Sequence, residues 1–576
     1  MDGVSYVTQC PITPMQQFTY KFEAYPRGTF WYHSHLGTQI AMGLYGPLIV
    51  KERDPQAMEE FVMMLQDWNH DMDADLIHFK VWFGNFINRT KVPPSHSLDG
   101  AFYSTFPYHA GLINGKGRFH YGNGSHNGAP LSIFTVTNGT DYRFRVIGAS
   151  GMYPFRISID NHPLLLVASD GYDCQPRVIE SVVVHPGERY DFIITANQTV
   201  GNYWIRGVTM ESGVDHISEA ILRYTGAPIE EPNSTRRNCT EDDRCLVMNC
   251  PFTYYPKNDN ITCLHLDDLA STNRTSAQPG SESKADSVEE VFLNFAFPGD
   301  AYTPGSVNGR EFVVPPVSSL TQPQDITSHC QPNQCGEDRR CACTYTIDLV
   351  YNKTYQLILL NMGKGKGFSH PIHLHGHSFQ VVKLGYPPYN ETTGQIMGDN
   401  LDINCGGNPN RSLSYCNQAK WANSSWGGNN VPGLNLLTPP RKDTILVPTG
   451  GYVVLRLKAD NPGVWFMHCH IEVHGLDGMA IMFNESFSSH PKPPPSFPKC
   501  GSFQYDKEAG SDAYTGNQTV SSTDDDEYDK RLFWIVVGCL IGLVVIQFVI
   551  IVVLCCRGKV GGGSGEKYEL SNNSRL

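Results

Sequence analysis

The sequence predicts an all-β protein built from sandwich or barrel domains, and three observations lead to this prediction. Short runs rich in β-branched and aromatic residues recur along the chain, and they end in Gly, Pro, Asn or Asp. The 576 residues include 54 Gly and 38 Pro, which favour many turns over long helices. Hydrophobic residues make up 40% of the chain and aromatic residues 11%, which is enough for packed cores. Short strands between frequent turns are typical of β-sandwiches and barrels.

Three β blocks follow one another along the chain. At about 100–200 residues per domain, a chain of 576 residues has room for about three domains. The first block, 1–52, contains runs such as QQFTYKFEA and GLYGPLIV, and the second, 53–228, contains FRISIDNHPLLLVASDG and VVVHPGERYDFIITA. The third block is 289–500. The polar segment between the last two, 229–288, is predicted to be a disulfide-tied insertion or linker because it holds Cys239, Cys245, Cys250 and Cys263.

The C-terminal part predicts a membrane anchor. Residues 532–556 carry no charge and exceed the roughly 20 residues that a membrane-spanning helix needs. The stem before them, 501–531, ends in DDDEYDK and is expected to be extended, and the tail, 557–576, is expected to be a disordered cytoplasmic segment. Sequons such as Asn88 and Asn197 lie before the helix. We therefore expect a single-pass plasma-membrane protein with an extracellular N-terminal part.

The charge balance excludes one class of partner. The chain has 44 basic and 57 acidic residues, a formal net charge of −13, and no basic run. Nucleic-acid binding needs a basic surface, so we expect no nucleic-acid partner.

Histidine occurs 21 times in the chain, and three clusters stand out. They are WYHSH at 31–35, HPIHLHGH at 370–377 and HCHIEVH at 468–474, the last followed by Met479. Residues i and i+2 of a β-strand point to the same face. Each cluster therefore holds a pair of histidines that can face neighbouring metal ions: His33 with His35, His373 with His375, and His468 with His470.

Cys469 predicts a second metal site. It lies between His468 and His470, so its side chain is expected on the opposite face of the strand, where it can meet His370 and His474. Two histidines and a thiolate with a weak axial Met, here Met479, describe a blue-copper electron-transfer site. The His-Cys-His tripeptide then joins an electron-entry copper to the metal ions on the other face by a short covalent path.

These clusters resemble the copper-binding signatures of multicopper oxidases, and the chain is similar to the laccase branch, in particular to the animal laccase-like enzymes. Six segments across about residues 1–490 carry the resemblance: TQCPI, GTFWYHSHLGTQIAMGLYGPLIV, LINGKGR, HPIHLHGHSFQVV, PPRKDTILVPTGGY and ADNPGVWFMHCHIEVHGLDGMAIMF. The resemblance implies three cupredoxin-like domains of the Greek-key type, the first of them incomplete. It also implies a type 1 copper and a trinuclear cluster of one type 2 and two type 3 coppers that reduces dioxygen to water.

The resemblance assigns ligands by position. The type 1 ligands are His370, Cys469 and His474, with Met479 axial, and His373 matches a type 2 ligand. Type 3 ligands are matched by His33, His35, His375, His468 and His470. His377 matches a position that usually supports ligands without being one. The resemblance also pairs Cys10 with Cys500.

Three acids complete the expected site. Asp2 and Glu472 resemble carboxylates that deliver protons to reduced dioxygen. Asp170 resembles the carboxylate that receives a phenol proton at the mouth of the type 1 pocket, although an Asp before Gly171 is equally well read as a turn residue.

The resemblance also predicts that part of the protein lies upstream of Met1. A fourth signature, HWHG, normally precedes the DG found here as Asp2 and Gly3, and it supplies one type 2 and one type 3 histidine. The chain as written lacks these two ligands, and it begins without an entry signal. We expect the 576-residue chain to show little dioxygen reduction until that segment is added.

Three functions are weighed on this basis. The leading one is a laccase-like oxidation of phenols and diphenols coupled to dioxygen reduction. A cell-surface ferroxidase that oxidises Fe(II) is the alternative among enzymes, and a catalytically inactive copper-binding surface protein is the alternative from another class. The oligomeric state stays open.

Overall fold

The computed structural model describes most of residues 1–501. Residues outside the description are 52–57, 89, 91–93, 107, 122–123, 215–216, 257–259, 273–287, 298–302, 332, 337–338, 364–366, 407–414, 496 and 502–576. The predicted membrane helix, the tail and all but the first residue of the stem therefore lie outside the described residues. Within the described part, no helix combines the length and apolarity required to cross a bilayer.

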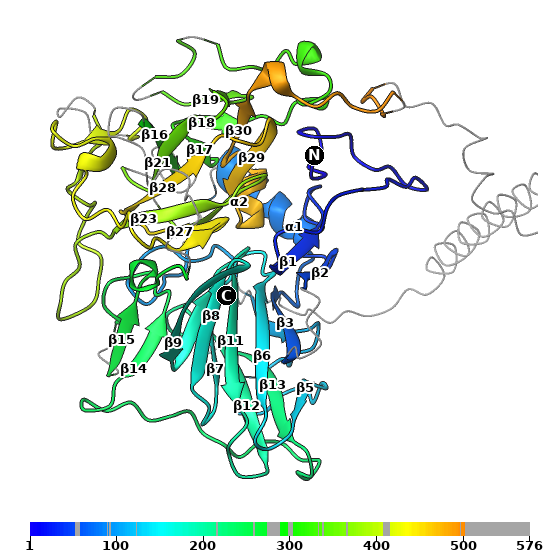
Figure 1. The fold of residues 1–576 in the computed structure, drawn as a ribbon, viewed down its shortest axis with the longest axis vertical. Helices are drawn as coiled ribbons and strands as arrows, with labels where there is room; N and C mark the ends of the chain where they lie inside the picture. Colours follow the sequence, from blue (N-terminus) through cyan, green and yellow to red (C-terminus); the bar gives the residue numbers. More distant parts are fainter. Residues whose placement is uncertain are drawn as a thin grey trace, which may run out of the picture. The chain divides into compact units, whose positions relative to one another are not determined.

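The described chain is mostly β-structure, as the sequence predicts (Figure 1). The N-terminal block forms an antiparallel pair, β1 (Gly28–His33) and β2 (Tyr45–Val50). The second block forms a 13-stranded sheet: β3 (Glu59–Trp68), β4 (Ala110–Ile113), β5 (Ser132–Val136), β6 (Asp141–Gly148), β7 (Phe155–Ile159), β8 (Leu164–Ser169), β9 (Tyr172–Ile179), β10 (Ser181–Val184), β11 (Arg189–Thr195), β12 (Asn202–Thr209), β13 (Ile217–Tyr224), β14 (Cys245–Met248) and β15 (Ile261–Leu264).

The third block contains three sheets. The largest has eight strands: β16 (Val288–Ala296), β17 (Ser306–Val307), β18 (Arg310–Phe312), β19 (Cys341–Cys343), β21 (Thr354–Leu360), β23 (Phe379–Gly385), β26 (Arg441–Lys442) and β28 (Tyr452–Lys458). The second has five: β20 (Thr346–Leu349), β22 (His370–Leu374), β27 (Thr444–Val447), β29 (Gly463–Cys469) and β30 (Ala480–Glu485). The third is the pair β24 (Ile403–Asn404) and β25 (Lys420–Trp421).

Helices are short in the described residues. They are α1 (Ala74–Phe79), the π-helix η1 (Lys80–Ile87), α2 (Glu472–Leu476) and four 3₁₀ turns, η2 (Leu266–Asp268), η4 (Pro323–Asp325), η5 (Gly428–Asn430) and η6 (Phe487–Ser489). Buried and exposed residues alternate along β5. One face of this strand therefore packs on the core and the other faces water. One large hydrophobic cluster joins residues of the second and third blocks.

The cysteine-containing segment is more than a linker. β14 pairs in parallel with β10, with Val247 opposite Ser181, so the segment extends the 13-stranded sheet. The disulfides Cys239–Cys245 and Cys250–Cys263 lie within it, as expected. The segment joins the sheet because it contains apolar side chains such as Val247 and Met248. Burying these side chains against the sheet stabilises the fold.

The segment between β3 and β4, residues 72–108, is named the cap. It contains α1 and η1, and Asp73 begins α1 by accepting a hydrogen bond from the Leu76 amide at 2.8 Å. Further along, Phe102 forms an isolated parallel β-bridge with Phe368, just before β22. The cap therefore reaches from the second block onto the third.

A disulfide fixes both ends of the described chain. Cys10 is bonded to Cys500, which confirms the pairing expected from the resemblance. Six disulfides leave two free cysteines among the described residues, the buried Cys174 and Cys469. Cys174 is therefore the described cysteine that takes part in neither a disulfide nor the predicted copper site.

Candidate metal centre

A buried His-Cys-His triad lies where β22 and β29 run side by side. These strands are antiparallel, with Ile372 opposite Cys469. The Cys469 sulfur lies 3.6 Å from Nδ1 of His370, at the start of β22, and 3.8 Å from Nδ1 of His474 in α2. All three side chains are buried. The three predicted type 1 ligands therefore converge on one point.

The turn after β29 explains the convergence. The chain leaves the strand at Cys469 and enters α2 three residues later at Glu472, which brings His474 back beside the cysteine. Met479 follows directly: its amide donates to the carbonyl of His474 at 3.0 Å, and its own carbonyl accepts from the amide of Cys469 at 3.0 Å. Met479 is fully buried next to the triad, which suits the axial position predicted for it.

Six histidines form a second cluster on the other side of the same strands. The ligand atoms of His35, His375 and His468 all lie within 4.8 Å of one another. The His33 and His373 rings lie 5.3 Å and 5.9 Å from the His470 ring. The structure therefore brings together the members that the sequence predicts: His33, His35, His373, His375, His468 and His470.

The prediction that both histidines of each pair lie on a β-strand is confirmed for one member of each pair. His33, His373 and His468 lie on β1, β22 and β29, whereas their partners His35, His375 and His470 follow just after those strands end. The paired rings are still neighbours, with centroids between 4.6 and 5.6 Å apart.

The hydrogen bonds of these histidines leave nitrogen atoms free to bind metal. Main-chain carbonyls contact Nδ1 of His33 at 3.0 Å, of His373 at 2.8 Å and of His468 at 2.9 Å. A hydrogen bond to one ring nitrogen fixes the orientation in which the other can act as a ligand. Nε2 of His35 and Nδ1 of His470 are buried without a hydrogen-bond partner, and such atoms in a polar cluster fit a bound cation.

Burial also sets the protonation of the ligands. It lowers the pKa values of His35, His468 and His470 well below the usual range, so these imidazoles are neutral and able to coordinate. Burial raises the pKa of the Cys469 thiol. A thiolate at this position therefore needs a bound cation, as the copper-thiolate chemistry of the predicted site supplies.

Of the two predicted proton-delivering acids, Asp2 contacts the cluster, and Glu472 follows the cluster residue His470 by two positions in the chain. An oxygen of Asp2 lies 2.6 Å from Nδ1 of His375; burial raises the pKa of Asp2, but the His375 ring outweighs it and brings it to about 2. Glu472 accepts hydrogen bonds from the amides of Ile40 and Ala41 at 3.1 and 3.4 Å. Burial raises the pKa of Glu472 to about 8, so it holds a proton near neutral pH.

Of the two readings of Asp170, the structure confirms the turn residue, since Asp170 lies in the turn after β8 with a φ of 46°, and it corrects the other. Asp170 does not lie at the mouth of the type 1 pocket, because its side chain is fully buried between the second and third blocks. It accepts hydrogen bonds from the amides of Arg189 and Thr444 at 2.8 and 3.0 Å, and Lys442 lies 3.2 Å away. No phenol reaches a carboxylate so enclosed, and Asp170 is instead part of a buried charge network.

This network is a part of the site that the sequence reading missed. Arg189 makes a bidentate ion pair with Asp443, with both N–O distances 2.5 Å. The main-chain carbonyl of Asp443 contacts Nδ1 of His373 at 2.8 Å. The RKD of the segment PPRKDTILVPTGGY was a usable signal, since buried charges are retained only where they are paired.

His377 is not brought to the metal cluster. Its Nε2 lies 2.7 Å from a carboxylate oxygen of the buried Glu485. His377 nevertheless lines the same open depression as His373, His375 and Asp2. That two more histidines lie upstream stays a prediction.

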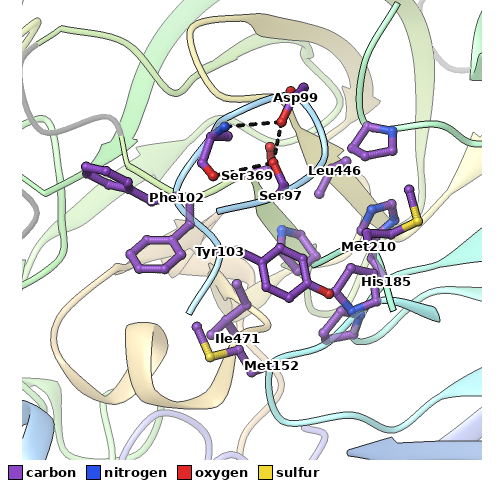
Figure 2. Close-up of a pocket in the computed structure, with 16 residues that line it drawn as sticks. Ser97, Asp99, Phe102, Tyr103, Met152, His185, Met210, Ser369, Leu446 and Ile471 are labelled. Carbon is purple, nitrogen blue, oxygen red and sulfur yellow. Dashed lines mark hydrogen bonds between the residues drawn. The ribbon is translucent and has the colours of Figure 1, made fainter. Parts of the chain in front are cut away.

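Two cavities flank the type 1 triad. Figure 2 shows the first, where Ser97, Asp99 and Tyr103 of the cap face His185 and Met210 of the second block. The second cavity is lined by His474 itself. Met152 and Phe368 line both cavities.

The fold and the site define a β-protein of cupredoxin-like domains with a His-Cys-His centre beside a six-histidine cluster. Family models described as multicopper oxidase match residues 1–55, 59–227 and 314–488. The chain is 31% identical to Laccase-4 of Thanatephorus cucumeris over 520 residues, which covers 87% of this chain and 77% of the relative. It is also 31% identical to a laccase of Trametes maxima over 496 residues, covering 84% and 78%.

Solved structures agree. The laccase of Botrytis aclada matches with a TM-score of 0.58 and 25% identity, covering 91% of this chain and 81% of that one. Fet3p, described as a multicopper oxidase that functions in iron import, matches with a TM-score of 0.58 at 22% identity, which shows the shared fold alone. The chain belongs to the multicopper oxidase family and is laccase-like. These relatives are fungal and leave the expected likeness to animal enzymes as a proposal.

Proposed function

We propose that this protein oxidises phenolic substrates one electron at a time at a type 1 copper and reduces dioxygen to water at a trinuclear copper cluster. Copper bound by His370, Cys469 and His474 would supply the one-electron redox chemistry. His373 would hold the type 2 copper, and His33, His35, His375, His468 and His470 the type 3 pair. Four phenols then release four electrons and four protons, which convert one dioxygen into two waters.

The cavity lined by His474 is the observation that supports a phenolic substrate. Phe297 and Phe368 hold their ring centroids 5.0 and 4.8 Å from the His474 ring. The lining also includes the apolar side chains of Ile77, Val81, Phe86, Met152 and Val473, together with the polar residues Asn85, Thr105, Tyr108 and Asp477. An apolar wall with aromatic rings suits an aromatic electron donor.

The same lining disfavours Fe(II) as the substrate. A hydrated divalent cation needs several oxygen ligands, and carboxylates are the usual ones. Asp477 is the one carboxylate among the described residues that line the cavity. A ferroxidase would need more of them here.

The chain's own acids support the dioxygen side. Glu472 holds a proton near neutral pH beside His470 and His474, and Asp2 stays ionised against His375. The first can supply a proton to reduced oxygen, and the second can orient a ligand histidine and accept protons from solvent.

Laccase-like activity is tested by measuring dioxygen consumption by the copper-loaded protein with hydroquinone and with Fe(II). We expect consumption with hydroquinone and little with Fe(II). Iron oxidation without phenol oxidation would favour the ferroxidase. If neither donor bleaches the visible band of the type 1 copper under anaerobic conditions, the inactive copper-binding protein becomes the better reading.

We also propose that the protein is of the animal laccase-like type and is anchored in the plasma membrane through 532–556. The proposal rests on the uncharged segment and on the sequons that precede it. Protease treatment of intact cells expressing the chain with a C-terminal tag should release the N-terminal part. Resistance of that part in intact cells would contradict it.

A further inference from the structure

The cap carries large apolar side chains on its outer surface, named here the outer stripe. Five residues of α1 and η1 form it and are 40–56% exposed: Leu76, Phe79, Trp82, Phe83 and Ile87. The inner side of the same helices is apolar as well, because Ile77, Val81 and Phe86 are buried. A helix that is apolar on both sides is usually covered on both, and a large exposed apolar patch marks a contact surface.

A row of residues in the outer stripe leads to Asn88. The main-chain amide of Asn88 donates to the carbonyl of Phe83 at 2.8 Å. This is the five-residue contact of a π-helix, so Asn88 follows Phe83 by about one turn on the same side. The Phe79 ring is parallel to the Phe83 ring, with centroids 5.6 Å apart and an interplanar angle of 4°. Phe79, Phe83 and Asn88 therefore follow one another along one side of the cap.

Asn88 also begins an acceptor motif for N-linked glycans, Asn88-Arg89-Thr90. Asn88 and Thr90 are both exposed. Nδ2 of Asn88, the atom to which a sugar is joined, donates a hydrogen bond to the Thr90 hydroxyl at 2.8 Å. The two side chains that define the motif therefore lie together at the surface, where the fold leaves room for a glycan.

We propose that Asn88 carries an N-linked glycan and that the first sugars of this glycan cover the outer stripe of the cap. The C–H groups on one face of a pyranose ring are apolar, and they pack on exposed aromatic rings such as those of Phe79 and Phe83. The covered stripe no longer drives association with other molecules. The proposal rests on the extracellular placement proposed above and does not depend on the oxidation of phenols.

The modification is a glycosyl transfer from a lipid-linked oligosaccharide diphosphate, the sugar donor of the secretory pathway. C1 of the first N-acetylglucosamine forms a bond to Nδ2 of Asn88, and its bond to the diphosphate oxygen breaks. Nδ2 loses one proton, and the lipid diphosphate leaves. No electron is transferred in this step.

Occupancy is measured by peptide mass spectrometry on the full chain, expressed in the secretory pathway behind an added entry signal. We expect a glycan on Asn88. Thr90→Ala should abolish it, whereas Thr90→Ser keeps the acceptor motif and should retain it. Asn138 lies in the exposed turn between β5 and β6 and also begins a motif, so it is the reference site.

The covering of the outer stripe is tested by removing the glycan. In Asn88→Gln, the fluorescence of Trp82, taken as the difference from Trp82→Phe, should be quenched more strongly by acrylamide. The Tm of Asn88→Gln should fall by about 2–4 °C. Asn138→Gln is the matched control and should change neither quantity. When Phe79 and Phe83 are both replaced by Ser, loss of the Asn88 glycan should no longer lower the Tm, because the rings that it covers are absent.

The outcomes separate this inference from the extracellular placement. If neither Asn88 nor Asn138 is modified, the placement fails and the inference fails with it. If Asn138 is modified and Asn88 is not, the inference alone is overturned. A glycan on Asn88 whose removal changes neither the quenching nor the Tm does not cover the stripe, which overturns it as well. Dimers of the glycosylated chain that disappear when Phe79 and Phe83 are replaced by Ser would make a second copy the occupant, with the same consequence.

Discussion

The type 1 triad draws its ligands from two neighbouring strands and the helix after them, whereas the histidine cluster also needs a separate N-terminal segment. β22 and β29 supply His370 and Cys469, and α2 supplies His474. The cluster adds His33 and His35, which follow from β1 at the other end of the chain. The triad is enclosed, while His373 and His375 border an open depression.

The difference shows which contacts each site depends on. Strand register brings His370 and Cys469 together, because Ile372 lies opposite Cys469, and the turn into α2 adds His474. The cluster depends on contacts between blocks, among them the Arg189–Asp443 ion pair and the Cys10–Cys500 disulfide. Substitutions in the triad should therefore leave copper binding by the cluster intact. Substitutions that break the contacts between blocks should weaken the cluster and leave the triad intact.

The largest effect is expected from Cys469→Ser. A hydroxyl is a poor ligand for the type 1 copper, so the visible band and the bleaching by hydroquinone should both fall below detection. The cluster should keep its copper, measured as total bound metal. Cys174→Ser, at the other free cysteine of the described residues, is the control and should keep the band. A retained band in Cys469→Ser would place the type 1 site elsewhere.

The second expected effect is from Asp443→Ala. This change removes the bidentate partner of the buried Arg189 and leaves it Asp170 at 3.8 Å, which should cost about 3–5 kcal/mol of unfolding free energy. The Asp443 carboxylate also lies 3.5 Å from Nδ1 of His373, so its loss should weaken cluster copper about 10- to 100-fold, while the type 1 band stays. Denaturant unfolding and metal titration measure the two. Asp173→Ala, which breaks the exposed pair with Arg27, should cost about 1 kcal/mol or less.

The disulfide gives a third test. Replacing Cys10 and Cys500 by Ser frees the segment that holds Asp2 against His375, and should lower stability by about 2–5 kcal/mol. Cluster copper should be lost more readily to a chelator, with the type 1 band unchanged. The pair Cys405 and Cys416, replaced in the same way, should lower stability without changing chelator sensitivity. Equal chelator sensitivity in the two variants would contradict the dependence of the cluster on the N-terminal segment.

The smallest effect is expected from His377→Gln. His377 contacts Glu485 and not the cluster, so copper content at both sites should be unchanged. Loss of the contact should cost about 1–3 kcal/mol, visible as a modest fall in Tm. Loss of a copper in this variant would mean that His377 is a ligand.

Local patterns in the sequence predicted much of the metal centre. The alternation of side chains along a strand predicted that Cys469 and its two histidine neighbours face different metal sites, and both clusters are found. The local Asp-Gly pattern predicted a turn at Asp170 correctly, but its substrate role was wrong, because its contacts depend on Arg189 and Lys442 from distant positions.

The sequence by itself determined the all-β class, the type 1 triad and the histidine pairs, because strand periodicity and ligand chemistry are local properties. Only the tertiary structure decided that the cap covers His474, that Asn85 and Asp477 face the same cavity, and that Arg189 and Asp443 support His373. Those residues lie far apart in the chain, and packing between blocks alone brings them together.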